Sequence, residues 1–577
     1  MRTKTSLLGG VAVGVMLAAI AAAPVQAKTA KAATEASETQ KQIDDLREQL
    51  QFLKDRLDEQ AQVSMKANTD LKAAQADAAA AKAEAAKSQA DLKTAQAQII
   101  QTIPAQITTQ VNTAVAANKP KTDKIYYKGI SITMGGFLEA ASVYRDHDET
   151  ADIGSSYAKI PFANDRAGHT GETRFTARQS RYSILAQGDV NKDTTAAFYG
   201  EFDFLGAAQT ANSNESNSYQ PRIRHVYGQV DWNGSGWHLL AGQNWSLVTL
   251  TNNGLMPRSE APPSVIDAQY VPGFAWTRNP QFRITKDWNK EWWLAVSVES
   301  PQTLISTNGT GGLQTGGVLT GVTQTVNQAP TSQFFNGTNY SLNSAPDVIG
   351  KVAWEKKIGD QKFHIEGFGI YRNFTARVTY NAAAAAALGS SAGNYTLNST
   401  GGGGGGTIAI YDVVPKHLDL QASYTAGNGI GRYGSTQMPD VTSRQDGTLE
   451  AVPETMWLAG GTFHANKDWD FYGFAGSEDV RAKTYSLSAT SGVGFGILPG
   501  SSNAGCLTEG GACSALNRSI DQYTGGFTWK FYQGSYGRAQ WGIQYSYTER
   551  KAFADAVGVA PKATENMLFT SFRFYPF

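Results

Sequence analysis

The chain has 577 residues, of which 41% are hydrophobic, and it is rich in glycine (59), phenylalanine (25), tyrosine (24) and tryptophan (12). Its 50 basic and 50 acidic residues balance, which argues against a nucleic-acid partner. Beyond the N-terminus no run of about 18 apolar residues occurs, which excludes a membrane-spanning helix. Low mean hydropathy (−0.34) with many aromatic residues is typical of an antiparallel barrel, in which alternate residues are apolar.

Residues 1–27 are predicted to be a secretory signal peptide. Arg2 and Lys4 form its charged start, Leu7–Ala23 its apolar core, and Val25-Gln26-Ala27 a cleavage site of small residues. A membrane anchor is the alternative, but the core contains three glycines and ends in small residues. Cleavage would leave a nearly neutral chain.

Residues 28–103 are predicted to form a periplasmic coiled-coil stalk. Apolar residues recur in one heptad register from residue 43 to residue 102, which indicates a coiled coil. The pattern is strongest at the positions Ile43, Leu46, Leu50, Leu53 and Leu57. Pro104 ends it, and residues 104–129 are expected to be a short helix and a linker. Whether such stalks trimerise or touch the cell wall is left open by the pattern.

From Ile130 onward apolar residues alternate with polar ones, which predicts β-strands over residues 130–577. Seven short turns separate these strands, near residues 188–194, 232–236, 287–291, 357–361, 414–417, 465–468 and 533–537. Eight long connections cover about residues 145–173, 206–221, 244–278, 300–346, 375–406, 427–453, 482–518 and 551–564. Short turns on one side and long loops on the other indicate an all-β transmembrane barrel of 16 antiparallel strands, with 18 as the alternative.

The last strand carries a barrel-closing signal, Tyr575 and the terminal Phe577. An exposed apolar strand at the end of a chain would be sticky, whereas pairing with the first strand would close a barrel. From these two aromatic residues we expect Phe569, Ser571 and Arg573 to share their outward face. A charged outward side chain would be covered if three barrels packed their first and last strands together, so Arg573 predicts a homotrimer interface.

A sixteen-stranded barrel has a water-filled lumen, so the predicted function is passive diffusion of small hydrophilic solutes across the outer membrane of a Gram-negative cell. The third long connection, Asn244–Arg278, is the predicted constriction loop, with four prolines and the acids Glu260 and Asp267. Arginines in neighbouring strands would line the pore and favour anions; they are Arg174, Arg178, Arg181, Arg222, Arg224, Arg278 and Arg283. The alternation of inward and outward residues places Arg283 on the inner face. Arg174 and Arg178 fall on the face opposite to that of Arg181 unless a bulge intervenes, so it is undecided which of them point inward.

Three motifs carry a family resemblance: Phe175–Tyr182, Arg222–Gly228 and Ala241–Ser246, with Gly427–Tyr433 adding to them. They resemble the DcaP-like family of trimeric Gram-negative porins. The resemblance implies a sixteen-stranded trimer that admits small anions such as dicarboxylates. The alanines of residues 382–387 and the glycines of residues 401–406 lie outside these motifs.

Cys506 and Cys513 stand in one long external loop of an exported protein, so a local disulfide is expected, with two free thiols as the alternative. The seven histidines show no metal spacing, and we expect no metal, no cofactor and no enzymatic activity. The rival hypothesis is a structural tether whose coiled coil reaches the cell wall. Residues 28–125 contain no recognisable peptidoglycan-binding module, which counts against it.

Overall fold

The computed structural model describes residues 82–84, 86–90, 93, 124–206, 220–305, 318–328 and 340–577. The chain divides into two compact units, residues 1–120 and residues 121–577. In the first unit the described residues are helical. The predicted signal peptide and the positions Ile43–Leu57 lie outside the described residues, so the coiled coil stays a prediction.

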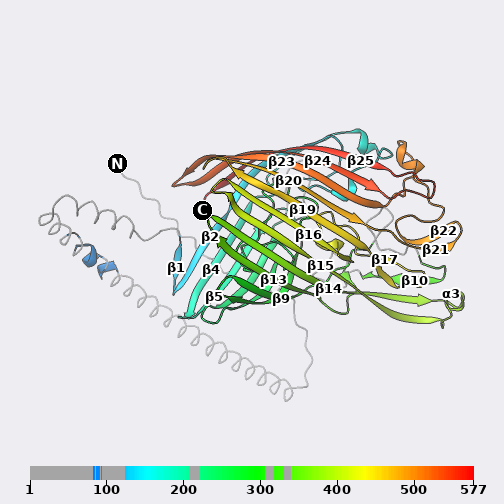
Figure 1. Ribbon diagram of the computed structural model, residues 1–577, viewed down its shortest axis with the longest axis horizontal. Coiled ribbons are helices and arrows are strands. Elements are labelled where there is room, and N and C mark those ends of the chain that lie inside the picture. Colours follow the sequence, from blue (N-terminus) through cyan, green and yellow to red (C-terminus); the bar gives the residue numbers. More distant parts are fainter. Residues whose placement is uncertain are drawn as a thin grey trace, which may run out of the picture. The chain divides into compact units, whose positions relative to one another are not determined.

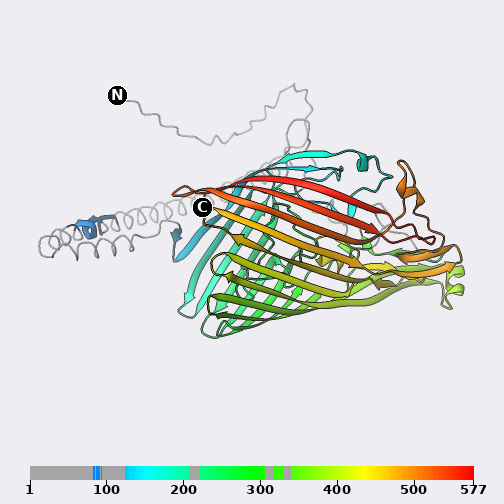
Figure 2. The ribbon, with the colours of Figure 1, turned by 45° about the horizontal axis from the view of Figure 1, so that its top comes forward.

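The described part of the second unit forms one closed antiparallel barrel of sixteen strands (Figures 1 and 2). The barrel-closing pairs run from Leu138 opposite Phe574 to Arg145 opposite Met567. Sixteen strands are confirmed among the described residues, and eighteen are not found there. In order around the barrel they are β2 (Ile130–Arg145), β3 with β4 (Glu172–Thr176 and Arg181–Asn191, counted as one interrupted strand), β5 (Thr194–Asp203), β6 (Arg222–Trp232), β7 (Trp237–Trp245), β8 (Arg278–Trp288), β9 (Trp292–Glu299), β13 (Asp347–Ile358), β14 (Gln361–Tyr380), β15 (Gly393–Val414), β16 (Leu418–Asn428), β19 (Pro453–His464), β20 (Trp469–Val480), β23 (Asn517–Gly534), β24 (Gly537–Ala552) and β25 (Lys562–Tyr575).

Smaller elements decorate the barrel. The loops carry β10 (Val322–Thr325), β11 (Asn327–Gln328), β12 (Tyr340–Ser341), β17 (Val441–Ser443), β18 (Leu449–Ala451), β21 (Lys483–Ser488) and β22 (Ser491–Phe495). They also carry the short 3-10 helices η1 (Tyr157–Lys159), η2 (Arg166–His169), η3 (Gly431–Tyr433) and η4 (Ala504–Leu507). The predicted linker differs from the structure at its end, because β1 (Ile125–Tyr127) pairs with the start of β2.

The short turns all fall where the sequence predicts them, whereas one long connection is much shorter than expected. Residues 375–406 were expected to form a loop, but β14 continues to Tyr380 and β15 begins at Gly393. Only the helix α3 (Ala382–Ala387) and a short turn join them in the described structure. The glycine run belongs to β15, paired on one side with β14 and on the other with β16.

The two faces of each strand differ as a membrane barrel requires. Outward positions carry exposed apolar side chains, as in Phe282, Ile284 and Tyr545. Inward positions are polar and buried by loops or by neighbouring side chains, as in Gln544 and Thr548. None of the helices among the described residues is long and apolar enough to cross a bilayer.

The closing strand β25 has the opposite orientation to the predicted one. Leu568 and Phe572 are 51% and 44% exposed, whereas Phe569 and Ser571 are buried. Arg573 therefore points into the barrel, where it bonds to Glu139 at 2.8 Å. The expected outward face was wrong, and with it the argument that an outward Arg573 marks a trimer interface.

An interruption in the second strand, between β3 and β4, determines which of its arginines point into the barrel. In β3 the exposed apolar side chain is Phe175, and Arg174 lies opposite the buried Val143 of β2, so Arg174 lies on the inner face. In β4 the exposed side chains are Tyr182 and Ile184, so Arg181 lies on the inner face. Arg174 and Arg181 share the inner face because the pairing with β2 shifts by one residue across the four-residue break between β3 and β4.

Candidate functional site

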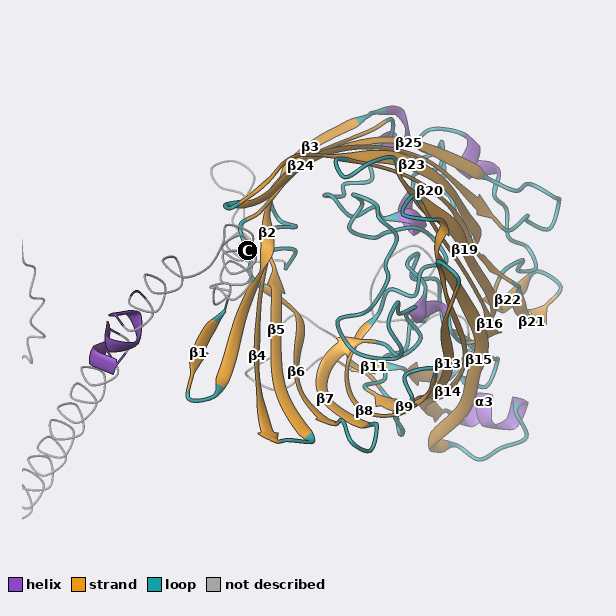
Figure 3. Cartoon of the chain, turned by 60° about the vertical axis from the view of Figure 1, so that its left-hand side comes forward, coloured by secondary structure: helices purple, strands orange, loops and turns teal. Residues whose placement is uncertain are grey.

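The candidate site lies inside the barrel, where the connection between β7 and β8, residues 246–277, crosses the lumen. Figure 3 looks along the barrel and shows the loops that fill part of it. This connection starts and ends on neighbouring strands, yet the far wall supplies several of its hydrogen-bond partners. It is called the inner loop below.

The far wall holds the tip of the inner loop. Gln544 of β24 accepts a hydrogen bond from the Ile266 amide at 2.5 Å, and Gln179 donates to the Ile266 carbonyl at 2.7 Å. Glu478 of β20 accepts from the Gly273 amide at 2.8 Å. Since these partners come from different parts of the barrel circumference, the inner loop spans the lumen instead of extending outside.

The near wall holds the first part of the inner loop through buried charges. Lys351 of β13 forms an ion pair with Glu366 of β14 at 2.6 Å and donates to the Thr249 carbonyl at 2.8 Å. Glu366 also accepts from the hydroxyl of Thr251 at 2.5 Å and from His364 at 2.9 Å. A buried pair of this kind is costly to break on one side, because the remaining charge would be left without its partner.

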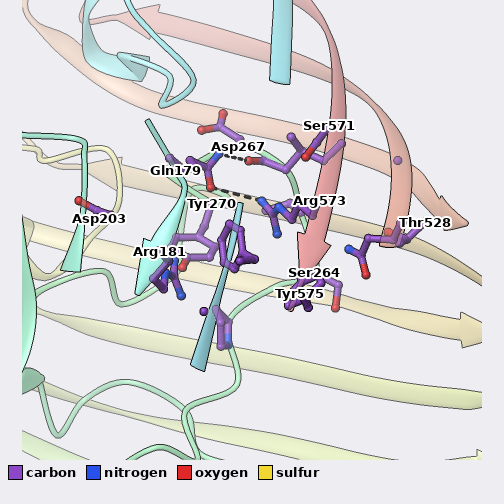
Figure 4. A pocket seen from close by; sticks show the side chains of 18 of the residues that line it. Gln179, Arg181, Asp203, Ser264, Asp267, Tyr270, Thr528, Ser571, Arg573 and Tyr575 are labelled. Atoms are coloured by element: carbon purple, nitrogen blue, oxygen red, sulfur yellow. Dashed lines mark hydrogen bonds between the residues drawn. The ribbon is translucent and has the colours of Figure 1, made fainter. Parts of the chain in front are cut away.

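A cavity of ≈ 550 Å³ remains between the tip of the inner loop and the barrel wall (Figure 4). Residues Pro262–Ala268 and Tyr270 form its loop side. Its charged lining consists of Arg181, Arg224, Lys530, Arg538, Arg573, Glu201, Asp203, Asp267 and Asp470. Basic side chains therefore come from both sides of β2, from β4 and β6 on one side and from β23, β24 and β25 on the other.

Two of the predicted arginines line this cavity. Arg224 is 4% exposed and bonds to Glu201 at 2.6 Å and to Asp203 at 2.9 Å. A register shift at this point of β6 turns Arg224 and His225 inward together. Arg181 is less compensated, because its closest carboxylate oxygen on Glu201 is 3.6 Å away without hydrogen-bond geometry.

Two more predicted arginines lie next to the cavity. Arg222 forms a two-pronged pair with Asp203, at 3.0 and 2.7 Å. Arg278 stacks between Trp245 and Trp276, with its guanidinium carbon 4.6 Å from each ring centre. One of its terminal nitrogens is buried without a hydrogen-bond partner among the described residues.

Tyr270 lies beside the cavity, close to three of the arginines. It stands on the inner loop with φ +66°, a conformation that side chains rarely adopt, and it faces the cavity. Burial by itself would raise its pKa, but Arg224, Arg181 and Arg278 together lower the pKa below its ordinary value. The three guanidinium groups around this phenol therefore stabilise its ionised form relative to the neutral form.

The structure places the remaining three predicted arginines elsewhere. Arg174 lies at the loop end of β3, half exposed, paired with Glu172 at 3.1 Å. Arg178 lies in the β3–β4 break and bonds to Asp152 at 2.6 Å. Arg283 points inward as parity predicts, but it is 2% exposed and donates to the Trp245 carbonyl at 2.7 Å, behind the inner loop.

The two loop acids do not form a row facing the arginines. Asp267 lines the cavity but accepts hydrogen bonds from the amide and hydroxyl of Ser155 at 3.1 and 2.6 Å. Glu260 accepts from Asn244 at 3.2 Å and is absent from the cavity lining. Burial raises the pKa of both carboxyl groups, against opposing contributions from Ser155 for Asp267 and from Arg283 for Glu260.

Sequence reasoning missed the basic side chains that β23, β24 and β25 add to the cavity. Lys530 pairs with Asp470 at 2.6 Å, and Arg573 pairs with Glu139. The guanidinium carbon of Arg538 lies 4.1 Å above the ring of Tyr575, and its Nε has no hydrogen-bond partner among the described residues. The alternation of β24 already put Arg538 on the polar face, and that was the available signal.

The connection between β2 and β3, residues 146–171, holds the inner loop in place through hydrogen bonds. Its Ser155 binds Asp267, and its Tyr157 donates to the Tyr270 carbonyl at 2.6 Å. Burial raises the pKa of Glu149 to about 7, although Arg145 opposes the shift.

The same connection touches the loop after β20. Cys506 and Cys513 are joined there by a disulfide, and the Cys506 carbonyl accepts a hydrogen bond from the Asn164 amide at 3.1 Å.

No protein-family model and no curated protein matches this sequence. Among solved structures, the outer-membrane channel DcaP of Acinetobacter baumannii aligns with a TM-score of 0.51 at 16% identity, over 78% of this chain and 99% of DcaP. The barrel has the fold of the DcaP channel. The predicted resemblance to DcaP-like porins is thereby confirmed at the level of the fold. Two further structures align with lower scores: OmpT of Vibrio cholerae (TM-score 0.40, 10% identity, 79% of this chain and 100% of OmpT) and the anion-selective porin from Comamonas acidovorans (0.39, 10%, 77% and 99%).

Proposed function

We propose that this protein is an outer-membrane porin through which small hydrophilic solutes, preferentially anions, diffuse passively. The observation that carries the proposal is the polar cavity of ≈ 550 Å³ between the inner loop and the wall of a closed barrel. Sixteen strands enclose a lumen that side chains alone do not fill. The inner loop would act as the constriction, because its anchors hold it across that lumen.

The proposed preference for anions rests on positive charges beside the cavity that no nearby carboxylate neutralises. Arg224 and Lys530 each have a carboxylate within 2.9 Å, whereas Arg181 and Arg538 face the cavity without such a partner. Arg181 also contributes to the lowered pKa of Tyr270. Dicarboxylates are the solute class that two separate guanidinium groups beside one cavity would suit, since each group binds a carboxylate in a fork.

We further propose an outer-membrane location and a homotrimeric assembly. The outward apolar positions of the barrel support the location, and the DcaP fold makes a porin-type trimer the natural expectation. The proposed transport contains no catalytic step and needs no cofactor. Chemical crosslinking of the protein in native membranes, followed by gel electrophoresis, would measure the number of chains per assembly.

Recording of single channels in planar bilayers tests the function. We expect ohmic conductance and, under a salt gradient, a reversal potential of the sign that anion permeation produces. Succinate added on one side should reduce the chloride current more than acetate at the same concentration. A barrel that conducts no ions, or one that prefers potassium to chloride, would contradict the proposal.

A further inference from the structure

A second cluster of ionisable side chains lies outside the cavity, at the seam where the barrel closes. Asp146 and His147 directly follow the first strand β2, and Glu565 stands near the start of the last strand β25. The seam brings them together because Arg145 of β2 pairs with Met567 of β25. One ligand-type atom from each residue lies within 4.8 Å of the other two.

The distances within this cluster match those of a metal site without its ion. Nδ1 of His147 lies 3.2 Å from Oδ1 of Asp146 and 3.3 Å from Oε2 of Glu565. Donors bound at about 2.1 Å in a tetrahedral zinc site are about 3.4 Å apart. Two of the three separations therefore have the length of a tetrahedron edge.

The hydrogen bonding of the cluster leaves one atom of His147 and one atom of Glu565 unused, whereas Oδ1 of Asp146 also accepts the Asn566 amide. Glu565 is 0% exposed, and its Oε2 is buried without a hydrogen-bond partner among the described residues, as is Nδ1 of His147. Buried polar atoms in folded proteins are almost always satisfied, so these two atoms indicate a place where a bound ion would fit. A cation bound to both would satisfy them and would also offset the repulsion between the carboxylates.

Hydrogen bonds hold both oxygens of Asp146 and Oε1 of Glu565 in place. The amide and side chain of Asn566 donate to the two oxygens of Asp146 at 2.7 and 2.6 Å. The amide of His147 donates to Oε1 of Glu565 at 2.9 Å. Partners of this kind orient ligands around a metal and fix which oxygen faces it. Arg145, the adjacent basic residue, is occupied by Glu172 at 2.8 Å and Glu149 at 3.7 Å.

We propose that Asp146, His147 and Glu565 bind a divalent transition-metal ion of the zinc type, which ties the first long connection to the closing strand. One imidazole nitrogen with two carboxylate oxygens suits zinc, cobalt or nickel better than calcium, which prefers oxygen donors alone. His147 and Asp146 keep 26% and 33% of their side chains exposed, so an ion can enter from solvent. This site is independent of the cavity and of the proposed transport function.

Zinc titration of the full-length protein in detergent, purified without a polyhistidine tag, tests the proposal. We expect one Zn²⁺ per chain by isothermal titration calorimetry, with an affinity at least about tenfold weaker in His147→Ala and in Glu565→Gln. Cobalt should give a visible absorption band in the wild type that both variants lose. His169→Ala is the matched control, because His169 lies in the same loop and contacts the Ala163 carbonyl; it should bind like the wild type.

Each variant is first checked for folding by its heat-modifiable mobility on gels, and Asp146→Asn replaces any variant that fails. A wild-type protein that binds no zinc would overturn the proposal and indicate that Asp146 and Glu565 share a proton instead. Equal zinc affinity in the wild type and in all folded variants would also overturn it.

Discussion

The charge of Arg538 provides the sharpest test of the proposed anion preference. A cavity of ≈ 550 Å³ has the volume of a sphere about 5 Å in radius, so an anion at its centre would be attracted to one guanidinium by about 0.8 kcal/mol in water. A cation would be repelled by a similar amount. With screening over about 10 Å in 0.1 M salt, Arg538→Gln should lower the anion-to-cation permeability ratio by roughly fivefold.

The assay is the reversal potential of single channels in a tenfold potassium chloride gradient, measured for wild type, Arg538→Gln and Arg181→Gln. Lys192→Gln is the control, because it removes the same charge from a short turn where the side chain is 90% exposed. Lower salt should enlarge the effect of Arg538→Gln, since screening weakens. An unchanged ratio in Arg538→Gln, or an equal change in Lys192→Gln, would refute the reasoning.

Three further predictions concern the inner loop and its supports. Gln544→Leu removes the 2.5 Å hydrogen bond to the Ile266 amide, so single-channel conductance should become larger or noisier; recordings identical to wild type would show that this bond does not hold the loop. Burial raises the pKa of Glu149 to about 7, so its contribution to stability is present below its ordinary pKa of about 4.5 and is lost as pH rises through 7. Glu149→Gln should therefore flatten the decline of the melting temperature between pH 5 and pH 8, and a parallel decline would contradict the assignment. Cys506→Ser opens the disulfide to Cys513, which should lower the melting temperature by a few degrees because the closed loop is short, while conductance stays unchanged; altered conductance would show that this loop also shapes the pore.

The fold was largely predictable because a membrane barrel repeats two local signals along its whole length. Alternation of apolar and polar residues marks each strand, and the difference between short turns and long loops counts the strands. Both signals depend on neighbours in the chain, so the sequence already contains them. The prediction failed at residues 401–406, since glycine disfavours strands in general.

At that glycine run, only the neighbouring strands explain the structure. Gly402 has φ +150°, and a Cβ placed on it would lie 2.1 Å from the Ile370 carbonyl oxygen. The neighbouring strand β14 approaches too closely for a side chain at this position, so glycine is required where propensity alone predicts a loop. Tertiary packing thus overrides the local preference.

The sequence alone also did not determine which face of the closing strand β25 points outward. Tyr575 and Phe577 suggested the outward face, but the alternate positions Leu568, Phe572 and Phe574 are equally apolar, and they are the ones that face outward. Tyr575 instead stacks beneath Arg538 inside the barrel. When both faces of a strand carry aromatic residues, parity by itself does not choose between them.

What the sequence determined by itself was the sixteen-stranded barrel and the connection that enters it. Arg181 and Arg224 were among its seven candidate arginines, but the sequence left the face of Arg181 undecided. Only the tertiary structure decided which charges are left uncompensated. Arg283 was assigned to the correct face but is covered by the inner loop, whereas Arg538 faces open space. Compensation depends on carboxylates and loops that come from distant parts of the chain, and no local pattern records those distances.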